Sequence, residues 1–194
     1  MGPNAHGRAV STVCCLLAAG AGRRFRAPSH KLLAPIGDRP LFSVTLEAMC
    51  ASGLPGAVVC GAQDLSAWCP PGVRVLHNTA WAEGLATSLA CAVDWAEDTG
   101  ATALVVGLAD APGIPADAWR RVAESPAAVA VASFDGVLHP PVRLAASVWT
   151  ELARRGDAGA RALFRRPGAL AVPCPGVPAD IDTVDDLEAW RAAR

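Results

Sequence analysis

The chain has 194 residues, of which 52% are apolar and 18% are charged, and its formal net charge is −1. This length suits one well-buried domain, and the composition excludes a disordered chain. The near-neutral charge gives no electrostatic support for binding to nucleic acid or to an anionic membrane, and no apolar run reaches the roughly 18 residues of a membrane span. We expect residues 1–9 to form a loose tail and residues 10–194 to form the single domain.

The seven cysteines are an odd set without a CxxC pair. A disulfide framework and a zinc site are therefore both poorly supported. Most of these cysteines lie in apolar runs, where reduced thiols pack as small hydrophobic groups. Reduced thiols are typical of a cytoplasmic protein, which is the location that we expect.

Strands and helices alternate along the sequence. The expected strands are residues 12–17, 56–60, 72–76, 101–108, 127–133 and 170–174, and the expected helices are residues 41–51, 85–93, 117–123, 145–155 and one that follows Thr183. A turn at Phe134-Asp135-Gly136 is expected to form a hairpin. This alternation predicts an α/β fold with a mostly parallel sheet.

The first strand runs directly into small residues, Leu17-Ala18-Ala19-Gly20-Ala21-Gly22, and three cations, Arg23, Arg24 and Lys31, follow. A strand that ends in small residues leaves backbone N–H groups free to bind a ligand, and the cations add positive charge. The stretch therefore predicts a loop that binds a polyphosphate.

Two better-known phosphate loops do not fit this stretch. A Walker loop requires a Gly-Lys-Ser/Thr sequence, which the stretch lacks. A dinucleotide fingerprint requires a third glycine at the position of Phe25. The second mismatch argues against the alternative that the chain is a nucleotide-dependent oxidoreductase.

The strand at residues 101–108 is followed by Asp110. Ligands of open α/β sheets gather beyond the carboxyl ends of the strands, and a carboxylate there can hold Mg²⁺ against triphosphate oxygens. An isolated aspartate after a strand is equally often a turn or capping residue. Together with the first loop, Asp110 becomes a candidate metal ligand.

Two later segments carry further candidate residues. Asp180 and Asp182 alternate about Ile181, so both carboxylates project to one side if the segment is extended. The sequence Gly156-Asp157-Ala158-Gly159-Ala160-Arg161 places an acid between glycines before a basic residue, which suits a clamp for an anionic second substrate. A helix–loop–helix junction capped by Asp157 is the alternative.

Five motifs in this order resemble those of the MobA/MocA-like nucleotidyltransferases, which include the molybdenum cofactor cytidylyltransferases. The family motifs are LAAGxGxRF…K, HNPxWxxGMxxSL, GDQP, GDxGAR and DIDTxxDL, which correspond here to residues 17–31, 77–89, 109–112, 156–161 and 180–187. The chain departs from the family pattern at Arg26, Thr79, Leu85, Ala111 and Pro140. His139 is one position away from the family's His or Asn, and we expect it to be a surface residue.

The resemblance implies a Rossmann-like, GT-A-type, three-layer αβα domain that transfers a nucleotidyl group from an NTP to a phosphate-bearing acceptor, releasing pyrophosphate. Ala19 favours CTP, and the implied acceptor is molybdopterin or the molybdenum cofactor, with a molybdoenzyme as a possible recipient. The implied cofactor is Mg²⁺, held by Asp110 and Asp182. The implied substrate contacts are Arg24 and Lys31 for the triphosphate; Leu17, Ala18, Ala19, Gly20, Gly22, Asn78, Gly84 and Ser88 for the nucleotide; and Asp157 and Arg161 for the second substrate.

Two further functions stay open within this resemblance. One is a guanylyltransferase, or a transferase with another acceptor. The other is a catalytically idle relative that binds a pterin cofactor as a chaperone, which the departures at Arg26, Ala111 and Pro140 would permit.

Overall fold

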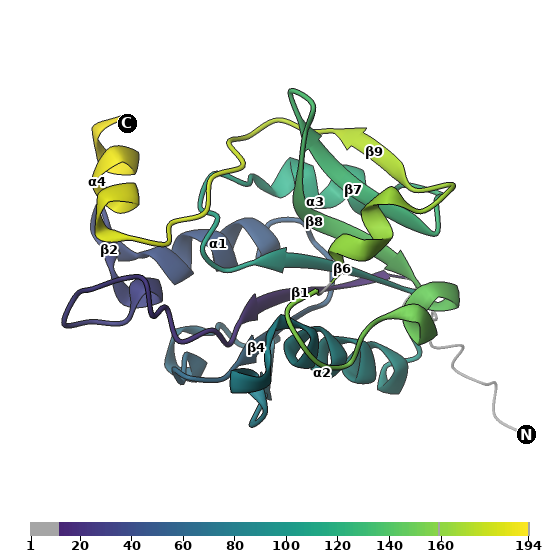
Figure 1. Ribbon diagram of the computed structural model, residues 1–194, viewed down its shortest axis with the longest axis horizontal. Coiled ribbons are helices and arrows are strands. Elements are labelled where there is room, and N and C mark those ends of the chain that lie inside the picture. Colours follow the sequence, from purple (N-terminus) through teal and green to yellow (C-terminus); the bar gives the residue numbers. More distant parts are fainter. Residues whose placement is uncertain (1–11, 159, 194) are drawn as a thin grey trace, which may run out of the picture.

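The computed structural model describes residues 12–158 and 160–193, so the tail expected at residues 1–9 lies outside the described part. A seven-stranded sheet of order β5-β4-β1-β6-β8-β7-β9 forms the centre, with helices on both of its faces (Figure 1). Its strands are β1 (Thr12–Ala18), β4 (Gly56–Cys60), β5 (Arg74–His77), β6 (Ala103–Leu108), β7 (Val129–Phe134), β8 (Val137–Ala145) and β9 (Leu170–Pro173). The other strands are the hairpin strands β2 (Pro35–Ile36) and β3 (Arg39–Pro40), and the α-helices are α1 (Leu41–Cys50), α2 (Leu85–Asp98), α3 (Ala116–Ala123) and α4 (Val184–Ala192). Short 3₁₀ helices cover Lys31–Leu33, Ser66–Trp68, Trp81–Glu83, Ala146–Glu151 and Arg161–Arg165.

The sheet is mostly parallel, as the alternation of elements predicts. Strands β5, β4, β1 and β6 pair in parallel, and β9 pairs in parallel with β7. Only β8 among these seven strands runs antiparallel to its two neighbours. The chain leaves β1 for β4 on one side and later returns to β6 on the other, so the strand order switches direction at β1. In folds of this kind, ligands bind at such a switch point.

The two faces of β1 belong to two separate apolar layers. Cys14 and Leu16 pack with residues of α1 and α3, whereas Val13 and Cys15 pack with residues of α2. All four side chains are fully buried. Figure 1 shows α1 and α3 on one side of the sheet and α2 on the other. The continuous apolar run of β1 is thus explained by burial on both of its faces.

The main difference from the expected secondary structure is at residues 145–155, where we expected a helix. Ala145 is instead the last residue of β8, where it pairs with Ala103, and a 3₁₀ helix covers Ala146–Glu151. The N–H groups of Ala145 and Ala146 donate to the carbonyls of Ala128 and Thr102, so the extended backbone of β8 continues to the residue where we expected the helix to begin. The expected hairpin turn is confirmed, because Asp135 and Gly136 both have positive φ, as a type I′ turn requires.

In the described part of the chain, no helix has both the length and the apolar character needed to cross a membrane.

The cysteines of β1 offer a test of this packing. Burial raises the pKa of Cys14 to about 12 and raises that of Cys15 well above its usual value. Because the thiolate is the reactive form, we expect neither thiol to react with iodoacetamide at pH 8 in the folded protein, and both to react after unfolding. Peptide mass spectrometry of the alkylated protein measures this. Rapid native labelling of Cys14 would contradict the described core.

Candidate active site

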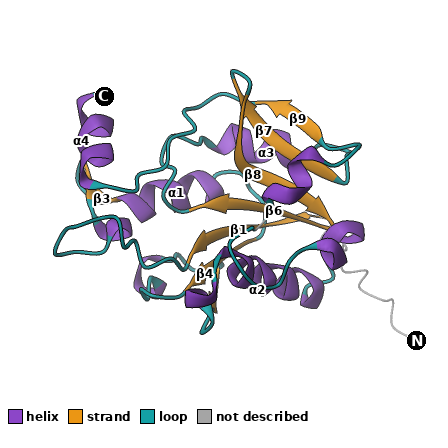
Figure 2. Cartoon of the chain, in the orientation of Figure 1, coloured by secondary structure: helices purple, strands orange, loops and turns teal. Residues whose placement is uncertain are grey.

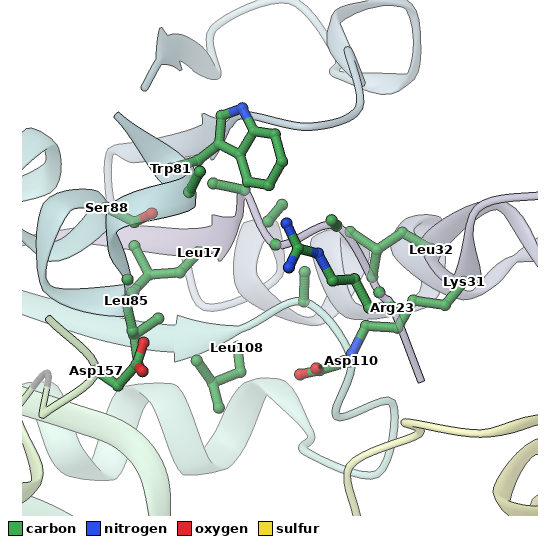
Figure 3. Close-up of a pocket in the computed structure, with 18 of the residues that line it drawn as sticks. Leu17, Arg23, Lys31, Leu32, Trp81, Leu85, Ser88, Leu108, Asp110 and Asp157 are labelled. Atoms are coloured by element: carbon green, nitrogen blue, oxygen red, sulfur yellow. Dashed lines mark hydrogen bonds and ion pairs between the residues drawn. The ribbon is translucent and has the colours of Figure 1, made fainter. Parts of the chain in front are cut away.

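A cleft of about 560 Å³ opens beyond the carboxyl ends of β1 and β6 (Figure 3). Most of the candidate residues from the sequence line it, namely Leu17, Ala18, Ala19, Gly20, Gly22, Arg24, Lys31, Gly84, Ser88, Asp110 and Asp157. Its volume lies within the range that is typical of small-ligand sites. The sheet therefore gathers these distant parts of the sequence at one edge.

Backbone contacts with neighbouring segments hold the loop after β1. The carbonyl of Leu17 accepts a hydrogen bond from the N–H of Ala109, and the carbonyl of Ala19 accepts one from the N–H of Ala62 (3.1 and 3.0 Å). Gly22 has a φ of +61°, and a β-carbon there would lie 3.0 Å from Cγ of Lys31. Glycine thus lets the loop turn back across the lysine side chain.

Lys31 joins two acids that are far apart in the sequence. Its Nζ lies 2.6 Å from Oδ2 of Asp110 and 3.1 Å from Oδ1 of Asp182. Figure 3 shows the Lys31 and Asp110 side chains pointing toward one another. Arg24 also reaches Asp182, with 2.8 Å between Nη2 and Oδ2. Asp110 and Asp182 therefore converge on a single ammonium group beside the loop.

Burial and charge oppose one another in this group. Burial of Lys31 disfavours its charged form, but the two carboxylates outweigh burial and raise the pKa of Lys31. Burial raises the pKa of Asp110, and the nearby Asp180 charge acts in the same direction, whereas Lys31 partly offsets both effects. The carboxylates are thus held in a partly dry environment by the cation between them.

The segment before α4 presents Asp182 through backbone hydrogen bonds. The N–H of Ile181 donates to the carbonyl of Asp110 (2.8 Å), and the Ile181 side chain is buried. The N–H groups of Asp182 and Thr183 donate to Oδ2 of Asp186, whose own N–H donates to Oγ1 of Thr183. The N-cap expected at Thr183 is thus confirmed, and the same cap fixes the backbone of Asp182.

Asp182 lines a second cavity of about 150 Å³, which it shares with Gly22, Arg23, Arg24 and Lys31. These last four residues also line the main cleft, so the two cavities adjoin. The Arg23 guanidinium extends over the cleft in Figure 3. Arg23 was expected as one of the three cations of the loop but not as a substrate contact, although its position next to Arg24 was a usable signal.

Asn78 does not line the cleft. It is buried, and its Nδ2 donates to Oγ1 of Thr87 and Oγ of Ser88 (2.8 and 3.0 Å), while its Oδ1 accepts from the N–H of Ala80. These bonds hold the first turn of α2 against the segment that follows β5. Asn78 thus supports the wall of the cleft rather than facing a ligand.

Gly84 allows residues 156–157 to close on the start of α2. Its φ is +113°, and a β-carbon there would lie 2.5 Å from the backbone of Gly156 and 2.7 Å from Oδ1 of Asp157. Two backbone hydrogen bonds, from Ala86 to Gly156 and from Gly156 to Glu83, fasten this contact. The resemblance pointed to Gly84, but its close approach to residues 156–157 was not visible in the sequence.

The expected clamp of Asp157 and Arg161 is not formed on one wall. Asp157 lines the main cleft, whereas Arg161 lines a neighbouring apolar pocket of about 50 Å³ with residues such as Val142 and Phe164. The two pockets share Leu17, Leu85 and Leu108. Arg161 therefore lines a pocket that adjoins the cleft, whereas Asp157 lines the cleft itself.

The expectation of a surface position for His139 is wrong. Its side chain is only 11% exposed, and its Nε2 lies 2.9 Å from Oδ1 of Asp180. Burial lowers the pKa of His139, but the hydrogen bond and charge of Asp180, the contact with the Pro140 carbonyl and the charge of Asp110 together outweigh burial, so the pKa is raised. Burial raises the pKa of Asp180, but His139 and the charges of Lys31 and Arg161 together outweigh it, so that pKa is lowered. A bulge explains the error, because Val131 pairs with Val142 and Ala132 with His139, so β8 contains two extra residues there.

The α/β architecture and the cleft at the switch point are those of a nucleotide-binding domain. The sequence model of the MobA-like NTP transferase domain matches residues 14–171. The chain is 30% identical over 193 residues to the purine catabolism protein PucB of Bacillus subtilis (strain 168), covering 92% of this chain and 93% of PucB. The chain belongs to the MobA-like NTP transferase family.

Solved structures agree with this assignment. A homologue of Mycobacterium tuberculosis Rv0371c from Mycobacterium sp. strain JC1 superposes with a TM-score of 0.80 at 27% identity, covering 94% of this chain and 96% of that one. Rv0371c of M. tuberculosis H37Rv, in a complex with manganese, has a TM-score of 0.74 at 28% identity, with 95% and 99% covered. The fold of this chain is therefore that of the nucleotidyltransferases.

The structural role of Asn78 can be tested by Asn78→Ala. The variant leaves the Ala80 N–H without its acceptor and the two hydroxyl groups without their amide donor, so we expect the free energy of unfolding to fall by about 2 kcal/mol. Urea denaturation measures this change. Gln63→Ala, at an exposed hydrogen bond, is the control and should change stability by less than about 0.5 kcal/mol. An equally small change for Asn78→Ala would refute the supporting role.

Proposed function

We propose that this protein transfers CMP from CTP to a phosphate-bearing acceptor of the molybdopterin type and releases pyrophosphate. The observation that best supports this proposal is the convergence of Asp110 and Asp182 on Lys31 beside a loop of small residues. Nucleotidyl transfer needs positively charged groups held in fixed positions around the negatively charged triphosphate. Lys31, and a cation held by the two carboxylates, can supply them. The seven cysteines, none of which is paired with another in the structure, suit a cytoplasmic location.

The chemistry needs no strong general base. An oxygen of the acceptor phosphate, already ionised at neutral pH, attacks the α-phosphorus of the NTP. The new P–O bond forms as the bond from the α-phosphorus to the bridging oxygen breaks, and pyrophosphate leaves with that electron pair. The protein then has two tasks, which are to hold the two anions in line and to offset the charge of the triphosphate.

Lys31, Arg23 and Arg24 are the groups that would bind the phosphates. An ammonium group has three N–H donors, and Lys31 uses two of them for Asp110 and Asp182. The third can donate to a phosphate oxygen in the adjoining cavities, both of which Lys31 lines. Arg23 and Arg24 line the same two cavities and can contact further phosphate oxygens.

Asp110 and Asp182 would hold the Mg²⁺ ion. Carboxylate oxygens are the hard ligands that this ion prefers, and one or two carboxylates commonly suffice when phosphates complete the coordination. Within residues 12–158 and 160–193, no cluster of three His, Cys, Asp or Glu side chains forms a metal site, so phosphate oxygens would have to complete the coordination. The manganese in the Rv0371c complex supports a divalent cation. When bound, the cation would neutralise charge on the triphosphate and the leaving pyrophosphate.

The packing around Ala19 supports a pyrimidine base. A β-carbon added at Gly61 would lie 2.7 Å from the β-carbons of both Ala19 and Trp81, so these three residues are in close contact. Ala19 and Trp81 both line the cleft. A methyl group at this crowded wall leaves less room than a glycine would, which favours cytosine over the larger guanine.

The reaction can be measured as pyrophosphate release from CTP, GTP, ATP or UTP in the presence of Mg²⁺ and molybdopterin. We expect CTP to react fastest, and EDTA to abolish the reaction. Asp110→Asn should lower the rate by about 10²- to 10³-fold, because it removes a charge from the metal site. Asp98→Asn makes the same chemical change at the exposed end of α2 and should leave the rate unchanged.

Two outcomes would contradict this proposal in different ways. A rate that survives Asp110→Asn would refute the metal assignment. Binding of molybdopterin without pyrophosphate release from any NTP would instead support a cofactor chaperone.

Base selection can be tested by Ala19→Gly. Removing the methyl group enlarges the space beside Trp81. We therefore expect the ratio of kcat/KM for GTP to kcat/KM for CTP to rise about tenfold, which is the discrimination that one carbon atom in a pocket typically provides. Steady-state kinetics with both nucleotides measure the ratio. An unchanged ratio would mean that Ala19 does not contact the base.

A further inference from the structure

We propose that His139 is a positioning residue that holds the Asp180 carboxylate away from Lys31, so that Asp182 is the acid presented to the cation site beside Asp110. This role rests on the function proposed above. It also chooses between two acids that the alternation about Ile181 left equivalent.

The contacts of the two acids differ. Asp180 accepts a hydrogen bond from Nε2 of His139 at 2.9 Å, whereas Asp182 pairs with Lys31 and Arg24 at 3.1 and 2.8 Å. Nδ1 of His139 lies 2.7 Å from the carbonyl of Pro140, so both ring nitrogens have partners. With the carbonyl as acceptor, Nδ1 and Nε2 are both donors, which is the charged form of the ring. His139 therefore supplies Asp180 with a cation of its own.

The backbone places Asp180 next to the Asp110 site. The following residue, Ile181, donates its N–H to the carbonyl of Asp110 at 2.8 Å, and the Asp110 side chain is paired with Lys31. Without His139, the Asp180 carboxylate would be partly buried without its hydrogen-bond partner, and it would then compete with Asp182 for the ammonium group of Lys31. His139 removes this competition by binding the Asp180 carboxylate itself.

The bulge in β8 brings His139 to this place. The pairing of β8 with β7 shifts between Val131 and Ala132, and Pro140 and Pro141 are accommodated there. Bulges near functional sites commonly redirect a side chain. The His139 ring then packs edge-on against Phe134, with 6.4 Å between the ring centroids, which limits its orientation. Pro140, which departs from the family pattern, is thus part of the bulge that directs the His139 side chain toward Asp180.

The backbone links the contact between His139 and Asp180 to the position of Asp182. Ile181, between the two acids, is 1% exposed and donates its N–H to the carbonyl of Asp110. With Ile181 fixed in the core and Asp180 fixed by His139, the segment presents the Asp182 side chain to Lys31 and Arg24. Groups that orient metal ligands in this way typically affect metal affinity by 10- to 100-fold.

The test is to measure the binding of Mn²⁺ to the whole chain in the presence of CTP. Electron paramagnetic resonance gives the concentration of the Mn²⁺ ion that remains free. We expect His139→Leu to weaken Mn²⁺ binding by about tenfold and His139→Gln, which keeps an N–H donor for Asp180, to restore most of it. A purely structural role would lower the melting temperature without changing Mn²⁺ affinity. His77→Leu, at the exposed end of β5, is the matched control and should bind Mn²⁺ as the wild type does.

Substitution of the acids tests the choice between them and covers the case in which His139→Leu fails to fold. Asp182→Asn should abolish Mn²⁺ binding, whereas Asp180→Asn, whose amide oxygen can still accept from His139, should change it by less than about threefold. Equal losses for the two acids, or wild-type affinity in a folded His139→Leu variant, would overturn the role of His139 alone. Wild-type protein that binds no Mn²⁺ with CTP would instead refute the proposed function, and this role with it.

Discussion

The ion pairs of Lys31 with Asp110 and Asp182 are the contact on which the rest of the site depends. Two carboxylates in a partly buried place repel one another and each loses hydration, so they stay together only around a cation. Lys31 supplies that cation from the loop after β1, while the acids come from the end of β6 and from the segment before α4. Figure 2 shows these loops on the side of the sheet toward which β1 and β6 point. One ammonium group thus ties three distant parts of the chain into one charged centre.

The sheet makes this centre possible. Because β1 and β6 are parallel neighbours, their carboxyl ends lie at the same edge, and the N–H of Ala109 donates to the carbonyl of Leu17 across the two ends. The change of direction in strand order leaves room beyond these ends, where no connection crosses. The cleft therefore follows from topology, and its charge follows from the residues that come directly after each strand.

Sequence reasoning was strongest where function and local pattern coincide. The run of small residues, the acid after β6 and the cap at Thr183 are local signals, and the structure brings these segments together. It was weaker where a role depends on a contact between distant segments. Asn78 contacts hydroxyls nine and ten residues away, His139 contacts an acid 41 residues away, and neither partner can be read from periodicity. The helix expected at residues 145–155 is absent for a related reason, because Ala145 is held at the end of β8 by pairing with Ala103, which is distant in the sequence.

The departures from the family pattern lie outside the charged centre. Arg26 is exposed and Ala111 is buried in the layer between the sheet and α1, while Pro140 is accommodated in the bulge of β8. None of these three residues is among those that line the main cleft in the described part of the chain. Pro140 lines the apolar pocket that adjoins the cleft, and Arg161 lines the same pocket. Lys31, Asp110 and Asp182 form one connected group in spite of the cost of bringing partly buried charges together, and this is the arrangement that the proposed transfer reaction would use.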